Sequence, residues 1–176
     1  MDIIKPNDVI EFVTLDMMGE VDDLYYVLLR SCNCTYLTYM IEWSGRKIYF
    51  SSNSDWRDVF IDNGLINICP IYGNAFEGIR TRKVVVSAWD HVDHDRGEQR
   101  DIRDLRNHFN IGHGLGLAMD RDGVRESLVF ASTIKNLNFH VEMSKSSMVD
   151  YAISRFRKIF RRQCKLAISG DECGRG

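Results

Sequence analysis

The sequence lacks an excess of charge, a long apolar run and the cysteine pairs of common metal sites. Lys and Arg total 23 against 25 Asp and Glu, a net charge of −2, so bulk charge does not draw the protein onto nucleic acid or an anionic membrane. No stretch approaches the ~20 apolar residues that cross a bilayer, and the N-terminus lacks the basic run and apolar core of a signal peptide. These absences predict a soluble, cytoplasmic protein that does not associate with membranes.

The composition is that of one folded domain. The chain has 176 residues, of which 44% are hydrophobic and 11% aromatic, enough for a sizeable core. Its five cysteines are odd in number and include no C-x-x-C pair, so we expect reduced thiols rather than a disulfide framework or a zinc site. We therefore predict neither a metal nor a cofactor.

Helical and strand periodicities alternate along the chain. Gly19 is expected to separate two N-terminal helices, and Ser54 with Asp55 to cap a later one. Asp122-Gly123 between two apolar runs is typical of a hairpin turn. The expected helices are 7–18, 21–28, 54–63, 70–76, 102–109 and 148–162, and the expected strands are 36–43, 47–50, 83–89, 114–119 and 126–133. Hairpin-connected strands with intervening helices predict an α+β sandwich around one antiparallel sheet.

The C-terminal region divides into an amphipathic helix and a tail. In the helix, apolar residues such as Phe156 form one stripe, and basic residues between 155 and 162 occupy the other face. We expect the basic face to be solvated rather than to contact DNA. We predict a domain over residues 1–165 and a polar tail or linker over 166–176.

Clusters that could carry catalysis or bind metal do not have the spacing that such chemistry needs. The densest group of potential ligands is Asp90, His91, Asp93, His94 and Asp95, which we interpret as a solvated loop. Neither Cys69 nor the serines near the histidines lie in a nucleophile motif such as G-x-S-x-G. We therefore predict that the chain is not an enzyme.

Aromatic residues are concentrated between residues 36 and 89. Such rings fill ordinary cores, but together with a few polar tips they also line small-molecule pockets. This concentration favours a pocket between the sheet and the helices that follow the first hairpin. The aromatic residues are Tyr36, Tyr39, Trp43, Tyr49, Trp56, Phe60, Tyr72, Phe76 and Trp89.

The order Trp56, Phe60, Pro70, Trp89 and Gly114 resembles the autoinducer-binding domain of the LuxR family of quorum-sensing transcription regulators. The resemblance covers about residues 5–165. It implies an α-β-α sandwich around a five-stranded antiparallel sheet, as in PAS and GAF domains, which encloses an acyl-homoserine lactone or another apolar signal between the sheet and one helical layer. It also implies a homodimer, or a heterodimer with a LuxR-type regulator.

The family's pattern is only partly present. The resemblance implies that Trp56 bonds the lactone carbonyl and that Trp89 forms a wall beside the head group. The family's aspartate before the proline is here Cys69, a weak acceptor, and its tyrosine one turn after the tryptophan is Phe60. The strand hydroxyl that holds the acyl carbonyl falls near Phe130, with Ser132 and Thr133 close by. The predicted ligand-binding residues are Trp56, Phe60, Cys69, Trp89, Tyr36, Tyr49, Tyr72 and Ser132.

These features predict a ligand-sensing regulatory domain whose signal is not an ordinary lactone. No helix-turn-helix pattern follows the last helix, so we expect no direct DNA binding by this chain. Either the chain is the sensing half of a longer regulator, or it is a short protein that forms inactive heterodimers with one. In the second case it is a ligand-independent antagonist whose pocket is filled by side chains such as Phe130 or Phe60. An enzyme on a PAS-like or GAF-like scaffold, using a Cys69 thiolate and a histidine, is a third alternative.

Overall fold

A computed structural model of the chain describes residues 15–43, 46–94, 97–121 and 123–173. Its centre is one five-stranded antiparallel sheet in the order β2-β1-β5-β4-β3, which confirms the predicted fold class. The strands are β1 (Tyr36–Trp43), β2 (Arg46–Ser51), β3 (Val84–Ala88), β4 (Gly114–Arg121) and β5 (Val124–Ala131). The α-helices are α1 (Leu15–Cys32), α2 (Ser54–Asp62), α3 (Pro70–Thr81), α4 (Gly97–His108), α5 (Phe139–Ser144) and α6 (Met148–Cys173), and the 3-10 turns are η2 (Leu65–Asn67) and η3 (Trp89–His91).

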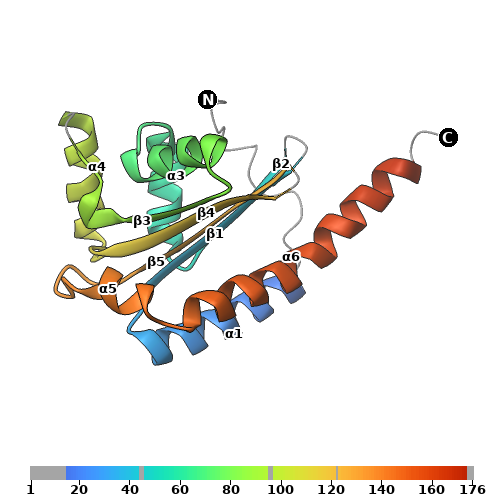
Figure 1. Ribbon diagram of the computed structural model, residues 1–176, viewed down its shortest axis with the longest axis horizontal. Helices are drawn as coiled ribbons and strands as arrows, with labels where there is room; N and C mark the ends of the chain where they lie inside the picture. The colour runs from blue at the N-terminus through green and yellow to red at the C-terminus, as the bar shows by residue number, and fades with distance from the viewer. Residues whose placement is uncertain (1–14, 44–45, 95–96, 122, 174–176) are drawn as a thin grey trace.

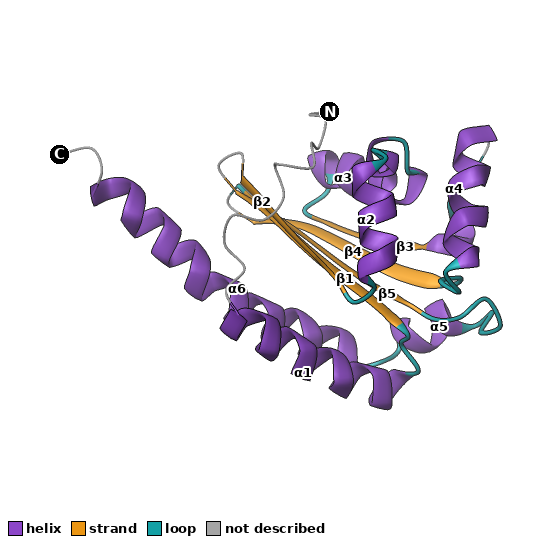
Figure 2. Ribbon diagram, turned by 180° about the vertical axis from the view of Figure 1, so that it is seen from behind, coloured by secondary structure: helices purple, strands orange, loops and turns teal. Residues whose placement is uncertain are grey.

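Helices cover both faces of the sheet (Figure 1). The helices α1, α5 and α6 lie on one face, and α2, α3 and α4 lie on the other, as the opposite view confirms (Figure 2). Successive side chains of a strand point to opposite faces, so each strand contributes to two separate cores. On β1, Tyr39 and Ile41 enter the core beneath α1 and α6, whereas Tyr36 and Met40 enter the core beneath α2, α3 and α4.

Among the described residues, one continuous helix crosses Gly19, where the sequence predicted a break between two helices. The described part of α1 runs through Gly19 without a break. Val21, Leu24 and Leu28 are almost fully buried on one face of it, and nothing lies within 4 Å of a Cβ placed on Gly19. A glycine costs a helix only about 1 kcal/mol, less than burial of this stripe contributes. Residues 7–14 of the predicted first helix lie outside the described residues.

Other boundaries also differ from those expected. The helix predicted over 70–76 continues to Thr81 as α3, and α4 begins at Gly97. The short helix α5 was not predicted, because its pattern is only Phe139 and Met143, one turn apart and both fully buried. The backbone of α6 stays helical to Cys173, past residue 166, where a polar tail was expected to begin. No helix among the described residues is long and apolar enough to span a membrane.

Candidate ligand-binding cavity

A cavity lies between the sheet and the layer of α2, α3 and α4. Its volume is about 70 Å³, several times the roughly 10–15 Å³ that one water needs. Aromatic and aliphatic side chains form most of its wall, with a small number of hydroxyls and one arginine among them. The lining residues are Tyr36, Thr38, Met40, Tyr49, Trp56, Phe60, Ile66, Cys69, Ile71, Tyr72, Ala75, Phe76, Ser87, Trp89, Ile102, Arg106, Gly116, Leu117, Ser127 and Val129.

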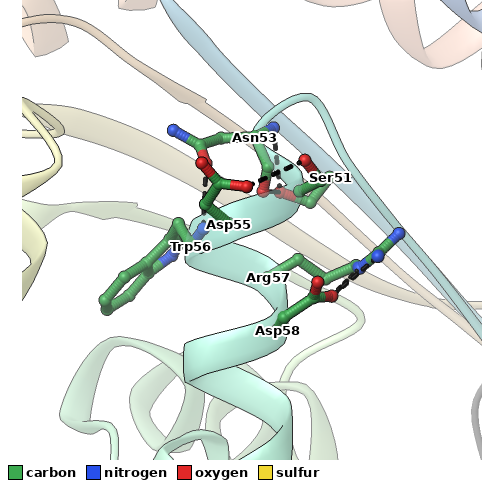
Figure 3. A network of polar contacts seen from close by, with 7 residues as sticks. Ser51, Asn53, Asp55, Trp56, Arg57 and Asp58 are labelled. Carbon is green, nitrogen blue, oxygen red and sulfur yellow. Dashed lines mark hydrogen bonds and ion pairs between the residues drawn. The ribbon is translucent and has the colours of Figure 1, made fainter.

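The start of α2 positions Trp56 in the wall. The Asn53 side chain accepts a hydrogen bond of 2.9 Å from the backbone N–H of Trp56, and Ser51 holds Asn53 in place through its backbone (Figure 3). Asn53 is therefore the N-cap of α2, whereas Ser54 and Asp55, the predicted caps, hydrogen bond to each other. The indole of Trp56 stacks on Phe60 with ring centroids 5.2 Å apart. This cap and stacking together fix the orientation of the indole.

Tyrosine hydroxyls meet at one point of the cavity. The hydroxyl oxygens of Tyr36 and Tyr49 are 3.5 Å apart, on the neighbouring strands β1 and β2. Burial raises the pKa of Tyr36 to about 12, although hydrogen bonds with Tyr49, Ser51 and Trp56 oppose that increase. Burial also raises the pKa of Tyr49. Both phenols are therefore neutral at physiological pH and can either donate or accept a hydrogen bond.

Trp89 and Arg106 form another part of the wall. The guanidinium carbon of Arg106 lies 4.4 Å from the centroid of the Trp89 ring, a cation–π contact. Arg106 Nε donates to the carbonyl of Ile111 at 3.3 Å. The indole Nε1 of Trp89 is buried and has no hydrogen-bond partner among the described residues. A buried donor without a partner is costly, so this part of the wall lacks an acceptor.

Close packing of Trp89 explains the glycine at the start of β4. A Cβ on Gly114 would lie 2.5 Å from the Trp89 ring, whereas a Cβ on Gly116 would meet its nearest neighbours at 3.7–3.8 Å. We expect Gly114→Ala to lower the free energy of unfolding by about 1–3 kcal/mol through overpacking. Gly116→Ala is the matched control and should change it by less than about 0.5 kcal/mol. Urea denaturation followed by tryptophan fluorescence measures both, and equal effects of the two substitutions would contradict this packing.

Cys69 contributes an uncharged thiol to the cavity. It lies at the N-cap of α3 with Pro70 after it, and its side chain does not cap the helix. Burial raises the pKa of the Cys69 thiol, although backbone N–H groups of the first turn oppose the increase. Cys69, which the resemblance aligns with the family's aspartate, therefore carries no negative charge at neutral pH. A catalytic thiolate needs the opposite shift of pKa.

We expect iodoacetamide to modify Cys69 more slowly than Cys32 in the folded protein near pH 8. Burial raises the pKa of Cys69, whereas a hydrogen bond with Cys34 lowers the pKa of half-buried Cys32. Because only the thiolate reacts, the Cys69 reaction should accelerate at higher pH than that of Cys32. Peptide mapping by mass spectrometry gives both rates, and in denaturant they should converge. Faster alkylation of native Cys69 would argue for the enzyme alternative.

The structure brings together seven of the eight predicted ligand-binding residues. Tyr36, Tyr49, Trp56, Phe60, Cys69, Tyr72 and Trp89 all line the cavity; their binding of a ligand stays a prediction. Ser132 does not line it, because its hydroxyl donates to the carbonyl of Asn33 at 2.9 Å. Phe130, aligned with the family's strand hydroxyl, lies fully buried in the opposite core beneath α1 and α6. The β5 residues that line the cavity are Ser127 and Val129.

Four polar residues of the wall were not predicted from the sequence: Arg106, Thr38, Ser87 and Ser127. Arg106 follows Ile102 by one helical turn, so it lies on the face of α4 that was predicted to be apolar, and it is only 6% exposed. A cation at a core-facing helical position was the available signal. In the group of potential ligands around Asp90, which we interpreted as a solvated loop, Asp90 contacts His113 and His140. No group of three or more His, Cys, Asp or Glu suited to a metal occurs in the described ranges.

No protein-family model and no curated protein matches this sequence, but solved structures share its fold. Escherichia coli SdiA superposes with a TM-score of 0.53 at 9% identity, over 85% of this chain and 63% of that one. CepR2 from Burkholderia cenocepacia, an N-acylhomoserine lactone dependent LuxR family transcription factor, gives 0.51 at 12% identity, over 85% and 96%. The VqsR LBD domain from Pseudomonas aeruginosa gives 0.56 at 10% identity, over 84% and 98%.

The chain therefore has the fold of LuxR-family autoinducer-binding domains, and the resemblance seen in the sequence is confirmed at the level of the fold. It spans less than two thirds of the SdiA chain, at 63%. SdiA is also known in complex with octanoyl-rac-glycerol, in a structure that covers 86% of this chain at a TM-score of 0.57 and 8% identity, and 61% of its own chain.

Proposed function

We propose that this chain is a ligand-sensing regulatory domain of the LuxR type, and that its cavity binds one small amphipathic molecule. The observation that carries the proposal is a cavity whose wall combines buried aromatic rings with converging polar groups, including the unpartnered Trp89 Nε1. Small-molecule sites have this composition, an apolar wall with a few polar groups that fix orientation. The shared fold with SdiA, CepR2 and VqsR supports the same function.

The ligand is not an ordinary acyl-homoserine lactone. Cys69 occupies the position of the aspartate that the resemblance assigns to the ligand amide, and its thiol is neutral and buried. Loss of a charged acceptor costs a complex on the order of 1.5–3 kcal/mol. Phe60 supplies no hydroxyl at the position of the family's tyrosine. Two polar contacts of the family's pattern, the aspartate and this hydroxyl, are therefore absent.

The antagonist alternative receives less support. It requires a cavity filled by the protein's own side chains, and Phe130 lies on the other face of the sheet. Phe60 lines the cavity and leaves about 70 Å³ open. Dimerisation through α6, with a second copy or a LuxR-type regulator, stays a prediction.

Thermal shift measurements test the proposal with lactones of increasing acyl length, monoacylglycerols, and small acids, amides and alcohols with apolar bodies. We expect at least one non-lactone compound to stabilise the native chain and standard lactones to have little effect. Gly116→Leu extends a side chain into the cavity and should abolish the shift, whereas Gly116→Ala should keep it. Strong stabilisation by a standard lactone would overturn the non-lactone assignment. Equal shifts in the native and Gly116→Leu chains would overturn the cavity as the site.

A further inference from the structure

Arg106 is a buried cation in the wall of an otherwise uncharged cavity. It is 6% exposed, and the other residues that line the cavity include no Asp, Glu, Lys or His. Burial lowers the pKa of Arg106, although Cys69, Tyr36 and Asp90 oppose that decrease. The ordinary pKa of a guanidinium is so high that Arg106 remains charged at neutral pH despite this decrease. The cavity therefore contains one fixed positive charge.

No described carboxylate neutralises this charge directly. None lies within 4.0 Å of the guanidinium of Arg106, which also borders an outer cleft containing Asp90 and Asp93. Asp90 is already engaged, because its carboxylate oxygens lie 2.5 Å from His113 Nδ1 and 3.2 Å from His140 Nδ1. Buried charges are normally paired, so the environment of Arg106 is incomplete.

A second buried donor in the same wall has no acceptor among the described residues. Trp89 lies beneath the guanidinium, is 6% exposed, and its Nε1 has no hydrogen-bond partner. Nε1 lies 3.8 Å from the position of a Cβ on Gly116, another lining residue. Two buried donors from η3 and α4 thus border one cavity, and the neutral Cys69 thiol is too weak an acceptor for either.

We infer that Arg106 and Trp89 form the head-group site of this cavity, and that the ligand is a small apolar molecule ending in a carboxylate. This inference rests on the proposed function and names the ligand class of that site. A monoanion matches one guanidinium and one indole N–H, whereas a phosphate dianion would leave one charge without a cation. The apolar body of the ligand would lie against Met40, Ile71 and Tyr72, which line the same cavity.

The inference is tested with pairs of ligands that differ only in charge, such as 3-phenylpropionate with 3-phenylpropionamide and octanoate with octanamide. Dissociation constants come from calorimetry on the full chain, with inorganic phosphate as an additional probe. We expect the native chain to bind the acid of a pair roughly 10- to 100-fold more tightly than the amide, the range of charge-assisted hydrogen bonds. In Arg106→Gln this ratio should fall to about one. Arg103→Gln, on the same helix, is the control and should keep it.

A purely structural role of Arg106, stacking on Trp89 and bonding the carbonyl of Ile111, would change stability but not the ratio of acid to amide affinity. If Arg106→Gln does not fold, Arg106→Lys retains the charge and should keep a preference for the acid with reduced affinity. Equal binding of acid and amide by the native chain, or tight binding of phosphate alone, would overturn the carboxylate assignment and leave the sensing function standing. Binding of neither acids nor any neutral compound would overturn both.

Discussion

Phe156→Ala should lower the free energy of unfolding by about 3–5 kcal/mol, the range for removal of a fully buried phenylalanine. Phe156 is fully buried in the core beneath α6, and its ring stacks on Tyr39 with centroids 4.5 Å apart and planes 6° apart. Phe50 and Phe160 approach the same ring at 6.4 and 6.2 Å. Truncation would remove the central ring of this group and leave a cavity.

Tyr151→Ala is the matched control, because Tyr151 lies on the same helix and is 41% exposed. It should change stability by about 0.5 kcal/mol or less. Urea denaturation followed by circular dichroism gives both free energies. Similar small losses from the two substitutions would mean that α6 does not pack on the sheet through Phe156.

Removal of either partner of the Glu126–Arg157 pair should cost about 3–5 kcal/mol, because the other charge would then remain buried alone. Arg157 Nε donates to Glu126 Oε2 at 2.8 Å, and the two side chains are 15% and 8% exposed. Glu126 faces the helix because it shares the β5 face of Leu128 and Phe130, which lie in the core beneath α6. This ion pair fixes α6 on the sheet.

A double-mutant cycle separates the interaction energy of the pair from the contributions of the two individual side chains. Glu126→Met and Arg157→Met should each be strongly destabilising, but the double variant should recover most of the loss, since apolar residues of similar volume often replace buried pairs at little cost. The Glu42–Arg125 pair on the other face is a comparison: Arg125 is 30% exposed, so Arg125→Met should cost less. Additive effects of Glu126→Met and Arg157→Met would contradict the ion pair.

The strands and the positions of the aromatic residues were largely predictable from sequence because both depend on local patterns. Period-two alternation in 36–43 placed β1 correctly, and Tyr36 to Trp89 supplied most of the cavity wall. The cap of α2 was predicted one or two residues late, because Asn53, Ser54 and Asp55 all have capping side chains. Only the backbone geometry distinguishes among them.

The remaining features depend on contacts between distant segments. Phe130 and Ser132 were expected near the ligand, but the face toward which each β5 side chain points follows from the register with β1 and β4. Apart from its spacing of one turn after Ile102, Arg106 is one more cation in the charged sequence of α4. Only the fold brings Trp89 against its guanidinium and removes it from water.

The central claim is that the cavity between the sheet and α2, α3 and α4 holds the signal, and a crystal structure of the chain grown with the most strongly stabilising compound tests it most directly. The account predicts that compound inside the cavity, its apolar body against Trp56 and Tyr72 and its polar end at Arg106 and Trp89 Nε1. An empty cavity with the compound bound elsewhere on the protein would contradict the claim.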